Sequence, residues 1–302
     1  MAMKYLIGID GGGTKTDCII TDEHYNQLYS LKGGPLNLLS SPPPESSRTI
    51  FQLINSCLSK LNITPTHLDC IGIGAAGAGR TEDSEKLEII LKALIPHSIK
   101  LRVITDAEAA LEGAFNGKPG CILISGTGSI IWGKDQDGLV HRCGGFGKII
   151  GDEGSGYILG KKGLIVAAKE FDGRGEKSLI TELLKDKYQI QSGQDLINAV
   201  YNNNLDISGI APIILASAGN NDKVALGIID EETDELLILV SCMMKKLKKE
   251  NIQISFAGSL ISTINVFSNT LKNKLSGSFK LIKIKKPEYS PAMGAVFIAK
   301  KK

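Results

Sequence analysis

A run of glycines near the start of the sequence has the residue types needed to bind an anion. Ile7 to Thr16 reads IGIDGGGTKT, and a second, largely apolar stretch follows at Asp17 to Thr21. Glycines between two such stretches predict a tight turn joining two strands, where side chains leave the backbone N–H groups uncovered. The residues that could contact a bound phosphate are Gly11, Gly12, Gly13, Thr14, Lys15 and Thr16. A glycine-rich hairpin without a ligand is the alternative interpretation.

Asp10 stands immediately before these glycines, at the end of the predicted strand. A carboxylate in that place could hold a hydrated Mg²⁺ ion beside the phosphate. The turn differs from a P-loop and from a dinucleotide-binding fingerprint, because both of those open a helix. A phosphate-binding turn between two strands is a different structural motif from both.

A second stretch of the same design follows a Gly- and Pro-containing break at 116–120. Cys121 to Gly133 reads CILISGTGSIIWG, which again predicts a strand, a Gly/Thr/Ser turn and another strand. The candidate phosphate contacts in this turn are Gly126, Thr127 and Gly128. Two copies of one unusual element indicate an internally duplicated fold.

Asp106 is the candidate catalytic residue. It follows a short buried strand predicted at Leu101 to Thr105 and opens a helix rich in alanine. A carboxylate at the carboxyl end of a strand in an α/β sheet points into the crevice where ligands bind. There it could accept a proton from an attacking hydroxyl group. The alternative interpretation is that Asp106 is the N-cap of the helix, and the two roles are compatible.

Two further loops carry side chains that suit sugar hydroxyl groups. Asn37 ends the loop GGPLN, and its carboxamide can both donate and accept hydrogen bonds, although a turn residue is the alternative. Asp152 and Glu153 lie side by side between glycines. Adjacent acids are costly to pack and useful as hydroxyl acceptors, so ligand binding is favoured for them over a surface turn.

The composition is that of an ordinary soluble globular protein. The 302 residues are 42% hydrophobic and 22% charged, with a net charge of +3, and they suffice for two domains of about 150 residues each. No stripe of arginines with interleaved aromatics occurs, so nucleic acid is not expected as a partner. No apolar run reaches about 18 residues and no cleavable signal is present, so we expect no membrane partner and a cytoplasmic location. The six cysteines are scattered without a C-x-x-C pair, which disfavours structural zinc and an iron–sulfur cluster.

Hydrophobic periodicity predicts three successive strands at the start of the chain and a middle part that is helical. The expected lobes are 1–117 plus 287–302, with the C-terminal helix packed back on the first domain, and 118–286. Strands are expected at 5–9, 17–21, 27–32, 69–75, 101–105, 121–124, 252–257 and 280–284. Helices are expected at 45–60, 81–95, from 106, and at 157–169, 176–188, 193–201, 207–218, 222–249 and 291–299.

Seven motifs occur in the order typical of the BadF/BadG/BcrA/BcrD ATPase family, a branch of the sugar kinase/actin/heat-shock-chaperone ATPase superfamily. Over essentially its whole length the chain resembles the N-acetylglucosamine kinase branch of that family. The motifs are DGGGTKT at 10–16, GPLN at 34–37, TDA at 105–107, SGTGS at 125–129, GGFG at 144–147, GDEGS at 151–155 and AGSL at 257–260. The resemblance implies an α/β fold with two actin-like ATPase (ribonuclease H-like) domains facing each other across a nucleotide cleft.

The resemblance also implies roles for the motif residues in an ATP-dependent amino-sugar kinase. ATP would lie in the cleft with its phosphates on the two glycine turns, and Asp10 would bind Mg²⁺ through water. Asp106 would act as general base on the 6-hydroxyl of the sugar, and a homodimer is expected. The residues implied to border the sugar are Asn37, Thr127, Gly145, Phe146 and Asp152. The residues implied to approach the adenosine are Ala257, Gly258 and Ser259.

The identity of the sugar stays open at this point. The kinase branch often carries Trp in place of Phe146, and some members carry Asn in place of Ile130, so the acyl group is in question. Glucosamine, N-acetylglucosamine and N-acetylmuramic acid are all candidates. Two other functions are possible: an ATP-driven activator of a radical dehydratase, which needs clustered cysteines, and a non-catalytic sugar-responsive regulator.

Overall fold

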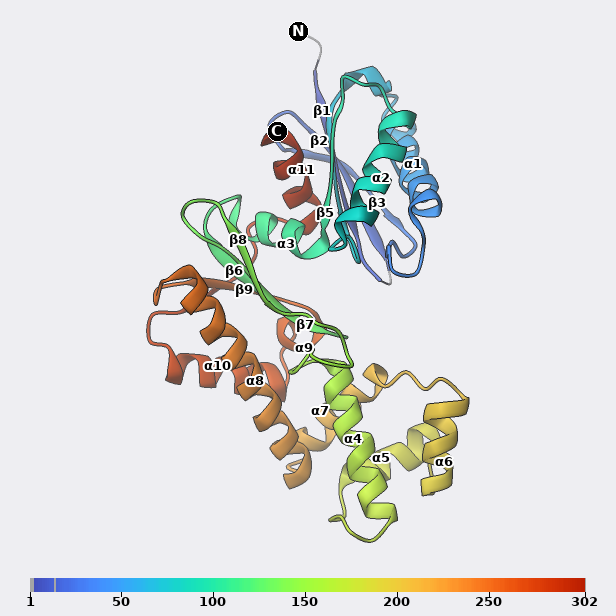
Figure 1. Ribbon diagram of the computed structural model, residues 1–302, viewed down its shortest axis with the longest axis vertical. Helices are drawn as coiled ribbons and strands as arrows, with labels where there is room; N and C mark the ends of the chain where they lie inside the picture. Colours follow the sequence, from blue (N-terminus) through green and yellow to red (C-terminus); the bar gives the residue numbers. More distant parts are fainter. Residues whose placement is uncertain (1–2, 14, 302) are drawn as a thin grey trace. The chain divides into compact units, whose positions relative to one another are not determined.

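Two five-stranded sheets with the same strand order form the framework of this protein (Figure 1). The computed structural model describes residues 3–13 and 15–301, so Thr14, one of the predicted phosphate contacts, lies outside the described residues. The strands are β1 (Tyr5–Gly11), β2 (Thr16–Asp22), β3 (Gln27–Gly33), β4 (Leu68–Ala75), β5 (Lys100–Thr105), β6 (Gly120–Ser125), β7 (Ser129–Lys134), β8 (Val140–Gly144), β9 (Gln253–Ala257) and β10 (Lys283–Lys285).

The first sheet has the order β3-β2-β1-β4-β5 and the second has the order β10-β9-β6-β7-β8. Read from its other edge, the second sheet is β8-β7-β6-β9-β10. Each strand then corresponds to one of the first sheet, with β6 in the place of β1. In the first sheet β1 runs antiparallel to β2 and parallel to β4. This repeat confirms the duplicated fold that the two glycine turns predicted.

Helices lie between the strands along the chain and at its C-terminal end. They are α1 (Pro43–Lys60), α2 (Thr81–Leu94), α3 (Asp106–Phe115), α4 (Gly156–Phe171), α5 (Leu179–Tyr188), α6 (Gly193–Ile197), α7 (Ala211–Gly219), α8 (Lys223–Leu247), α9 (Ser259–Ser262), α10 (Val266–Ser278) and α11 (Pro291–Lys301). Two predictions differ in extent. The helix expected at 193–201 ends at Ile197 and continues as a π-helical turn, Asn198–Asn202. The last strand, expected at 280–284, is the short β10.

By its internal contacts the chain divides into two compact units. Unit 1 comprises the residues up to Ile122, Gln136–Leu139 and the stretch from Lys286 onward, and unit 2 comprises Leu123–Asp135 and Val140–Lys285. Within residues 3–13 and 15–301, every helix is too short or too polar to cross a lipid bilayer.

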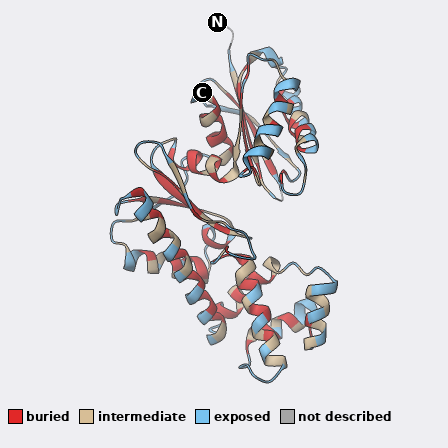
Figure 2. Ribbon diagram, viewed as in Figure 1, coloured by how far each residue is buried: buried red, intermediate tan, exposed pale blue. Residues whose placement is uncertain are grey.

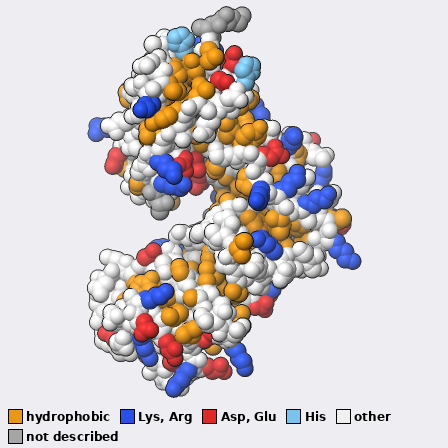
Figure 3. All heavy atoms as spheres, turned by 180° about the vertical axis from the view of Figure 1, so that it is seen from behind, with side chains coloured by type: hydrophobic (Ala, Val, Ile, Leu, Met, Phe, Trp, Pro, Cys, Tyr) orange, Lys and Arg blue, Asp and Glu red, His pale blue; other side chains and the backbone are white. Residues whose placement is uncertain are grey.

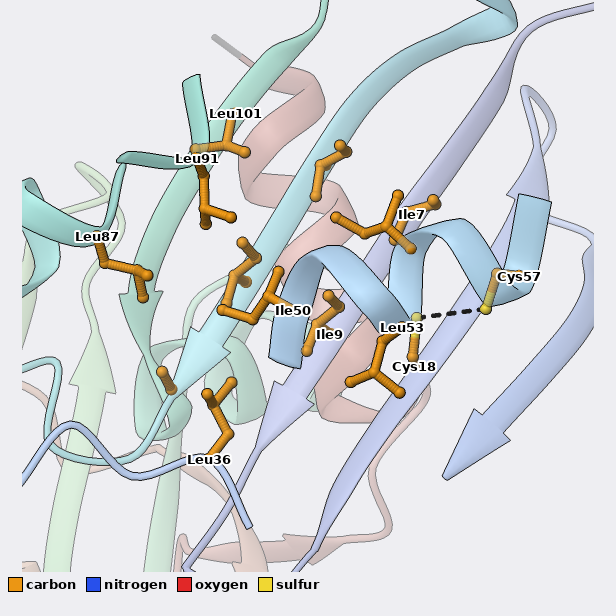
Figure 4. Packing of buried hydrophobic residues seen from close by; sticks show 14 of the residues in the cluster. Ile7, Ile9, Cys18, Leu36, Ile50, Leu53, Cys57, Leu87, Leu91 and Leu101 are labelled. Atoms are coloured by element: carbon orange, nitrogen blue, oxygen red, sulfur yellow. Dashed lines mark hydrogen bonds between the residues drawn. The ribbon is translucent and has the colours of Figure 1, made fainter. Parts of the chain in front are cut away.

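The core of unit 1 lies between its sheet and the helices α1 and α2. Side chains of the strands, such as Ile7 and Ile9, face Ile50 and Leu53 of α1, and all four are buried (Figure 4). The thiol sulfurs of Cys18 and Cys57 are 3.6 Å apart within this cluster. They pack as small hydrophobic groups, as expected for cysteines inside apolar runs.

Helix α11 covers the other face of the first sheet, beside α3. It packs on β1 and β4, and most of its residues are buried (Figures 1 and 2). Close approach is possible because Gly8 and Gly72 face it. A Cβ atom on Gly8 would overlap the backbone of Ala292, and one on Gly72 would overlap the backbone of Ala295. The prediction that the C-terminal helix packs on the first domain is therefore confirmed.

Gly72→Ala is expected to lower the free energy of unfolding by about 1–3 kcal/mol, because a helix backbone cannot move aside for the new methyl group. Gly227→Ala on α8 is the matched control. No heavy atom lies within 4 Å of the methyl group it would add, and it lies in an exposed helix interior. Gly227→Ala is expected to raise stability by about 0.5–1 kcal/mol. Urea titrations of both variants test this, and equal midpoints would contradict it.

Lysines gather at the rim of unit 2. The lysines that follow Met244 at the end of α8 are exposed, and so are those of β10, the edge strand of the second sheet (Figure 3). Charged side chains on an edge strand discourage pairing with another chain. These lysines lie at the solvent-exposed end of a helix and on an exposed edge strand.

Candidate functional site

The first glycine turn connects β1 and β2 and is closed by the backbone. The Gly12 N–H donates to the Lys15 carbonyl oxygen (2.9 Å). The Gly12 carbonyl in turn accepts from the Leu36 N–H (2.9 Å), and the Gly11 carbonyl accepts from the Ala76 N–H (2.7 Å). Around Gly13 a Cβ atom would meet nothing within 4 Å. The turn is therefore held from two neighbouring loops, and among the described residues the space beside Gly13 is free.

Asp10 lies at the end of β1 among other acids. It pairs with Asp17 on β2 and with Gly74 on β4. Burial, followed by the negative charges of Asp106 and Asp17, raises the pKa of Asp10 to about 6. The Lys15 ammonium, which lies 3.0 Å from the Asp17 carboxylate, only partly offsets this. A cation bound at this position would relieve the accumulated negative charge.

Asp106 lies close to Asp10 because a glycine separates them. Gly74 of β4 pairs with Asp10 on one side and with Ile104 of β5 on the other. A Cβ atom on Gly74 would lie 3.6 Å from the Asp106 Cα and 2.6 Å from the Ala109 Cβ. The small residue lets α3 approach the sheet, so the two carboxylates influence each other.

The Asp106 side chain is not the N-cap of α3. Thr105 is the N-cap: its hydroxyl accepts from the Glu108 N–H (3.0 Å), and the Glu108 carboxylate returns to the Thr105 N–H (3.2 Å). This capping box corrects the N-cap interpretation of Asp106, because the Thr105 hydroxyl already accepts the Glu108 N–H. Asp106 Oδ1 accepts from the Ala107 N–H (2.9 Å), and burial raises the pKa of the carboxyl group.

Asn37 is held beside the first glycine turn by its neighbours. Leu36 is fully buried against Gly11, and Asn37 forms an isolated bridge with Ala76. The Asn37 carboxamide oxygen accepts from the Leu39 N–H (3.0 Å), as in a turn. The turn interpretation and the ligand interpretation therefore coexist, because the amide NH₂ group takes no part in that hydrogen bond.

The second glycine turn lies between β6 and β7 and touches the loop that follows β9. The Gly126 N–H donates to the Gly128 carbonyl (3.0 Å). Gly258 has φ +85°, and a Cβ atom there would overlap the carbonyl group of Ser125. The Ser259 nitrogen lies 3.7 Å from the position of a Cβ on Gly126. The structure thus brings the second turn together with the Ala257–Ser259 motif.

Asp152 lies against the same turn. Its carboxylate oxygen would be 2.9 Å from a Cβ on Gly128. Burial raises the pKa of Asp152, whereas hydrogen bonds from the Ser129 and Gly147 backbone oppose that rise. Asp152 has φ +62°, in the left-handed region that aspartate tolerates better than most residues.

Phe146 stands out from the loop next to Asp152. Its side chain is 64% exposed, and the Arg142 guanidinium carbon lies 5.4 Å from the centre of its ring. Gly145 has φ +70°, and a Cβ there would overlap Ile130. An exposed ring on a loop supported by glycines can act as a platform for a ligand.

A pocket of about 260 Å³ in unit 2 opens beside the second glycine turn. Its lining residues are Gly126, Thr127, Gly156, Asp206, Ser208, Gly209, Ala211, Pro212, Leu215, Ser259 and Leu260. Gly126, Thr127 and Ser259 were predicted from the sequence. The stretch from Asp206 to Leu215 was not, because it was interpreted as a plain helix.

The missed stretch begins with a turn rather than a helix. The Ser208 hydroxyl donates to the Asp206 carboxylate (2.6 Å), and a 3₁₀ turn at Ser208–Ile210 leads into α7. An Asp-x-Ser-Gly sequence is a turn signal that could have been noticed. Its position beside Gly126 could not, since about eighty residues separate the two.

Comparison with known proteins identifies the fold. A candidate N-acetylglucosamine kinase from Chromobacterium violaceum has a solved structure that matches with a TM-score of 0.78 at 23% identity, covering 98% of this chain and 99% of that one. The duplicated sheets with a glycine turn in each are thus those of the sugar kinase and actin-like ATPase fold.

The chain belongs to the BadF/BadG/BcrA/BcrD ATPase family, whose model matches residues 7–299. The N-acetylmuramic acid/N-acetylglucosamine kinase of Clostridium acetobutylicum is 37% identical over 99% of both chains. The N-acetyl-D-glucosamine kinase of Dictyostelium discoideum is 28% identical over 99% of this chain and 98% of its own.

Proposed function

We propose that this protein is an ATP-dependent kinase that phosphorylates the 6-hydroxyl of N-acetylglucosamine and N-acetylmuramic acid. The observation that carries the proposal is the placement of Asp106 directly after β5, close enough to Asp10 for the two charges to interact, within a chain 37% identical to a kinase named for those two sugars. Phosphoryl transfer needs alignment and charge neutralisation above all, together with a group that takes the proton of the nucleophile.

Asp106 is the general base in this proposal. Its carboxylate accepts the proton of the sugar hydroxyl as that oxygen attacks the terminal phosphate. The hydrogen bond from the Ala107 N–H orients the carboxylate. Partial burial brings its pKa closer to neutrality, which suits a base that must both accept and release a proton.

Asp10 suits Mg²⁺ as a single carboxylate ligand. No cluster of three or more His, Cys, Asp or Glu side chains that could hold a metal occurs in the described part of the chain. The ion would therefore depend on waters and phosphate oxygens for its other ligands, as Mg²⁺ commonly does in kinases. When bound, Mg²⁺ neutralises charge on the phosphates. The Gly13 N–H would supply a further donor to the same phosphates, whereas the Gly12 N–H is already bound to the Lys15 carbonyl oxygen.

The unit 2 pocket is the proposed adenosine site. Its wall combines apolar surface from Ala211, Pro212, Leu215 and Leu260 with the polar turn at Asp206. Gly126 and Thr127 connect this pocket to the second phosphate turn, and Gly258 permits the close approach of the loop after β9. We also propose that Gly128, Ala257 and Ser259 contact the nucleotide, because the loop after β9 packs against the second glycine turn.

Leu215→Glu is expected to raise KM for ATP at least about tenfold and to leave KM for the sugar unchanged. The reason is that a carboxylate would replace the apolar wall of the pocket. Leu226→Glu is the matched control, since Leu226 is 37% exposed on α8 and does not line the pocket. Steady-state kinetics with each substrate varied in turn measure the effect. Equal KM values for ATP in the two variants would show that the pocket does not bind the nucleotide.

We propose that the sugar is bound by Asn37, Thr127, Gly145, Phe146 and Asp152. Phe146 lies against Gly151 and Ile130 against Gly145, so both present apolar surface on the loop that carries Asp152, which favours a sugar with an acyl group over glucosamine. The test is an ADP-release screen over glucosamine, N-acetylglucosamine, N-acetylmuramic acid, N-acetylmannosamine and glucose. Faster turnover of glucose than of the acetylated sugars would overturn the assignment.

Three further expectations remain proposals. The lobes are proposed to be 1–117 plus 287–302 and 118–286, and the chain is proposed to form a homodimer, which light scattering tests. A cytoplasmic location is proposed as well. The radical-dehydratase activator is disfavoured because it needs cysteines clustered at a dimer face, whereas five of the six cysteines here are buried.

A further inference from the structure

A buried carboxylate on α8 reaches the loop that carries Asp152. Glu232 is 2% exposed. One of its oxygens accepts from the Gly154 N–H at 2.6 Å, and the other lies 2.6 Å from the Lys162 ammonium. A carboxylate is costly to bury unless every oxygen has a partner. Both oxygens are satisfied here, one of them by the backbone of the loop.

The same loop is held from the opposite side by the second glycine turn. The Ser125 hydroxyl donates to the Gly154 carbonyl (2.7 Å), and the Ser129 hydroxyl donates to the Glu153 carbonyl (2.6 Å). These two serines flank Gly126–Gly128. The peptide groups of Glu153 and Gly154 are therefore clamped between the glycine turn and α8.

The clamp requires a glycine at its centre. Gly154 has φ +76°, and a Cβ atom there would overlap the Leu236 side chain of α8. The absence of a side chain at Gly154 therefore lets the helix approach the loop backbone at this residue. Asp152, two residues earlier, has φ +62° and rests against Gly128. Rotation of the Gly154 peptide would carry the Asp152 backbone with it.

We propose that Glu232 is a positioning residue that sets Asp152 for binding the sugar. The inference rests on the proposed function, because it takes Asp152 as a sugar ligand. Glu232 does not touch the substrate. It fixes the Gly154 peptide, and through it the strained Asp152, against the second glycine turn.

Glu231 provides a matched control on the same helix. Its carboxylate lies 2.7 Å from the Lys162 ammonium, as close as that of Glu232, but its side chain is 69% exposed. It shares the cation with Glu232, and the hydrogen bond to Gly154 belongs to Glu232 alone. Comparing variants at the two positions therefore separates the effect of the ion pair with Lys162 from the effect of the hydrogen bond to Gly154.

The experiment compares Glu232→Ala, Glu232→Gln and Glu231→Gln with the wild type. Glu232→Ala leaves the Gly154 N–H buried and unpaired, so KM for N-acetylglucosamine is expected to rise roughly tenfold to a hundredfold, with KM for ATP nearly unchanged. Glu232→Gln can still accept from Gly154 and is expected to recover part of the loss. Glu231→Gln is expected to behave as the wild type.

A readout independent of turnover accompanies the kinetics. Amide hydrogen exchange of the peptide covering 151–156, without ligand, is expected to quicken in Glu232→Ala and to stay unchanged in Glu231→Gln. Glu232→Ala with wild-type KM values and only a lower melting temperature overturns this inference alone. A wild-type protein that phosphorylates none of the five sugars overturns the proposed function and this inference with it.

Discussion

Asp106→Asn is expected to lower kcat on N-acetylglucosamine by about 10² to 10⁴-fold, with KM for ATP nearly unchanged. The carboxamide has the shape of the carboxylate, and its oxygen can keep the hydrogen bond from the Ala107 N–H. It cannot take the proton of the sugar hydroxyl. The loss therefore falls on the chemical step rather than on folding or nucleotide binding.

The matched control is Glu108→Gln, two residues further along the same helix. Glu108 serves the capping box with Thr105, and glutamine can serve there as well. We expect this variant to keep kcat within a few-fold of the wild type. A melting curve for each variant shows whether α3 is intact. An Asp106→Asn enzyme that turns over within about fivefold of the wild type would exclude the base role.

Asp10→Asn is expected to make the protein more stable at neutral pH while weakening its use of Mg²⁺. The pKa of Asp10 is raised from 3.8 to about 6 in the folded chain. Between those values the folded state keeps a proton that the unfolded state has released, so stability falls as the pH rises through this window. Above pH 6 the penalty is complete and amounts to about 3 kcal/mol.

The gain in Asp10→Asn should therefore approach about 3 kcal/mol at pH 7.5 and disappear near pH 4, as urea titrations at both pH values would show. Asp17→Asn is the matched control, because it removes a neighbouring charge and leaves the proposed metal ligand in place. With ADP present, millimolar Mg²⁺ is expected to raise the melting temperature of the wild type and of Asp17→Asn. The same shift in Asp10→Asn would contradict the assignment of Asp10 as the metal ligand.

The glycine turns were predictable from the sequence because their chemistry is local. Three successive glycines between two apolar stretches favour a turn between strands, and the second turn repeats the first. The strand order then confirmed the duplication. Asp106 was predictable in place but not in local structure, since the cap belongs to Thr105. Competition between two adjacent residues that can both cap is settled by which side chain reaches the N3 amide.

Glu232 and the pocket stretch from Asp206 to Leu215 were beyond the reach of the sequence. Glu232 lies 78 residues from its partner Gly154 in an amphipathic helix, where a glutamate ordinarily faces water. No sequence pattern near either residue predicts the contact. Its existence depends on how closely α8 approaches the loop at Gly154.

The sequence by itself determined which residues have the groups suited to binding phosphate and accepting a proton, because residue type and turn propensity act over a few neighbours. The tertiary structure decided which of them share a site. Asp10 meets Asp106 across Gly74, and Asp152 meets Gly128, because strand pairing and the close approach of helices to glycines are set by packing between distant segments. Those contacts are long-range, and only the folded chain specifies them.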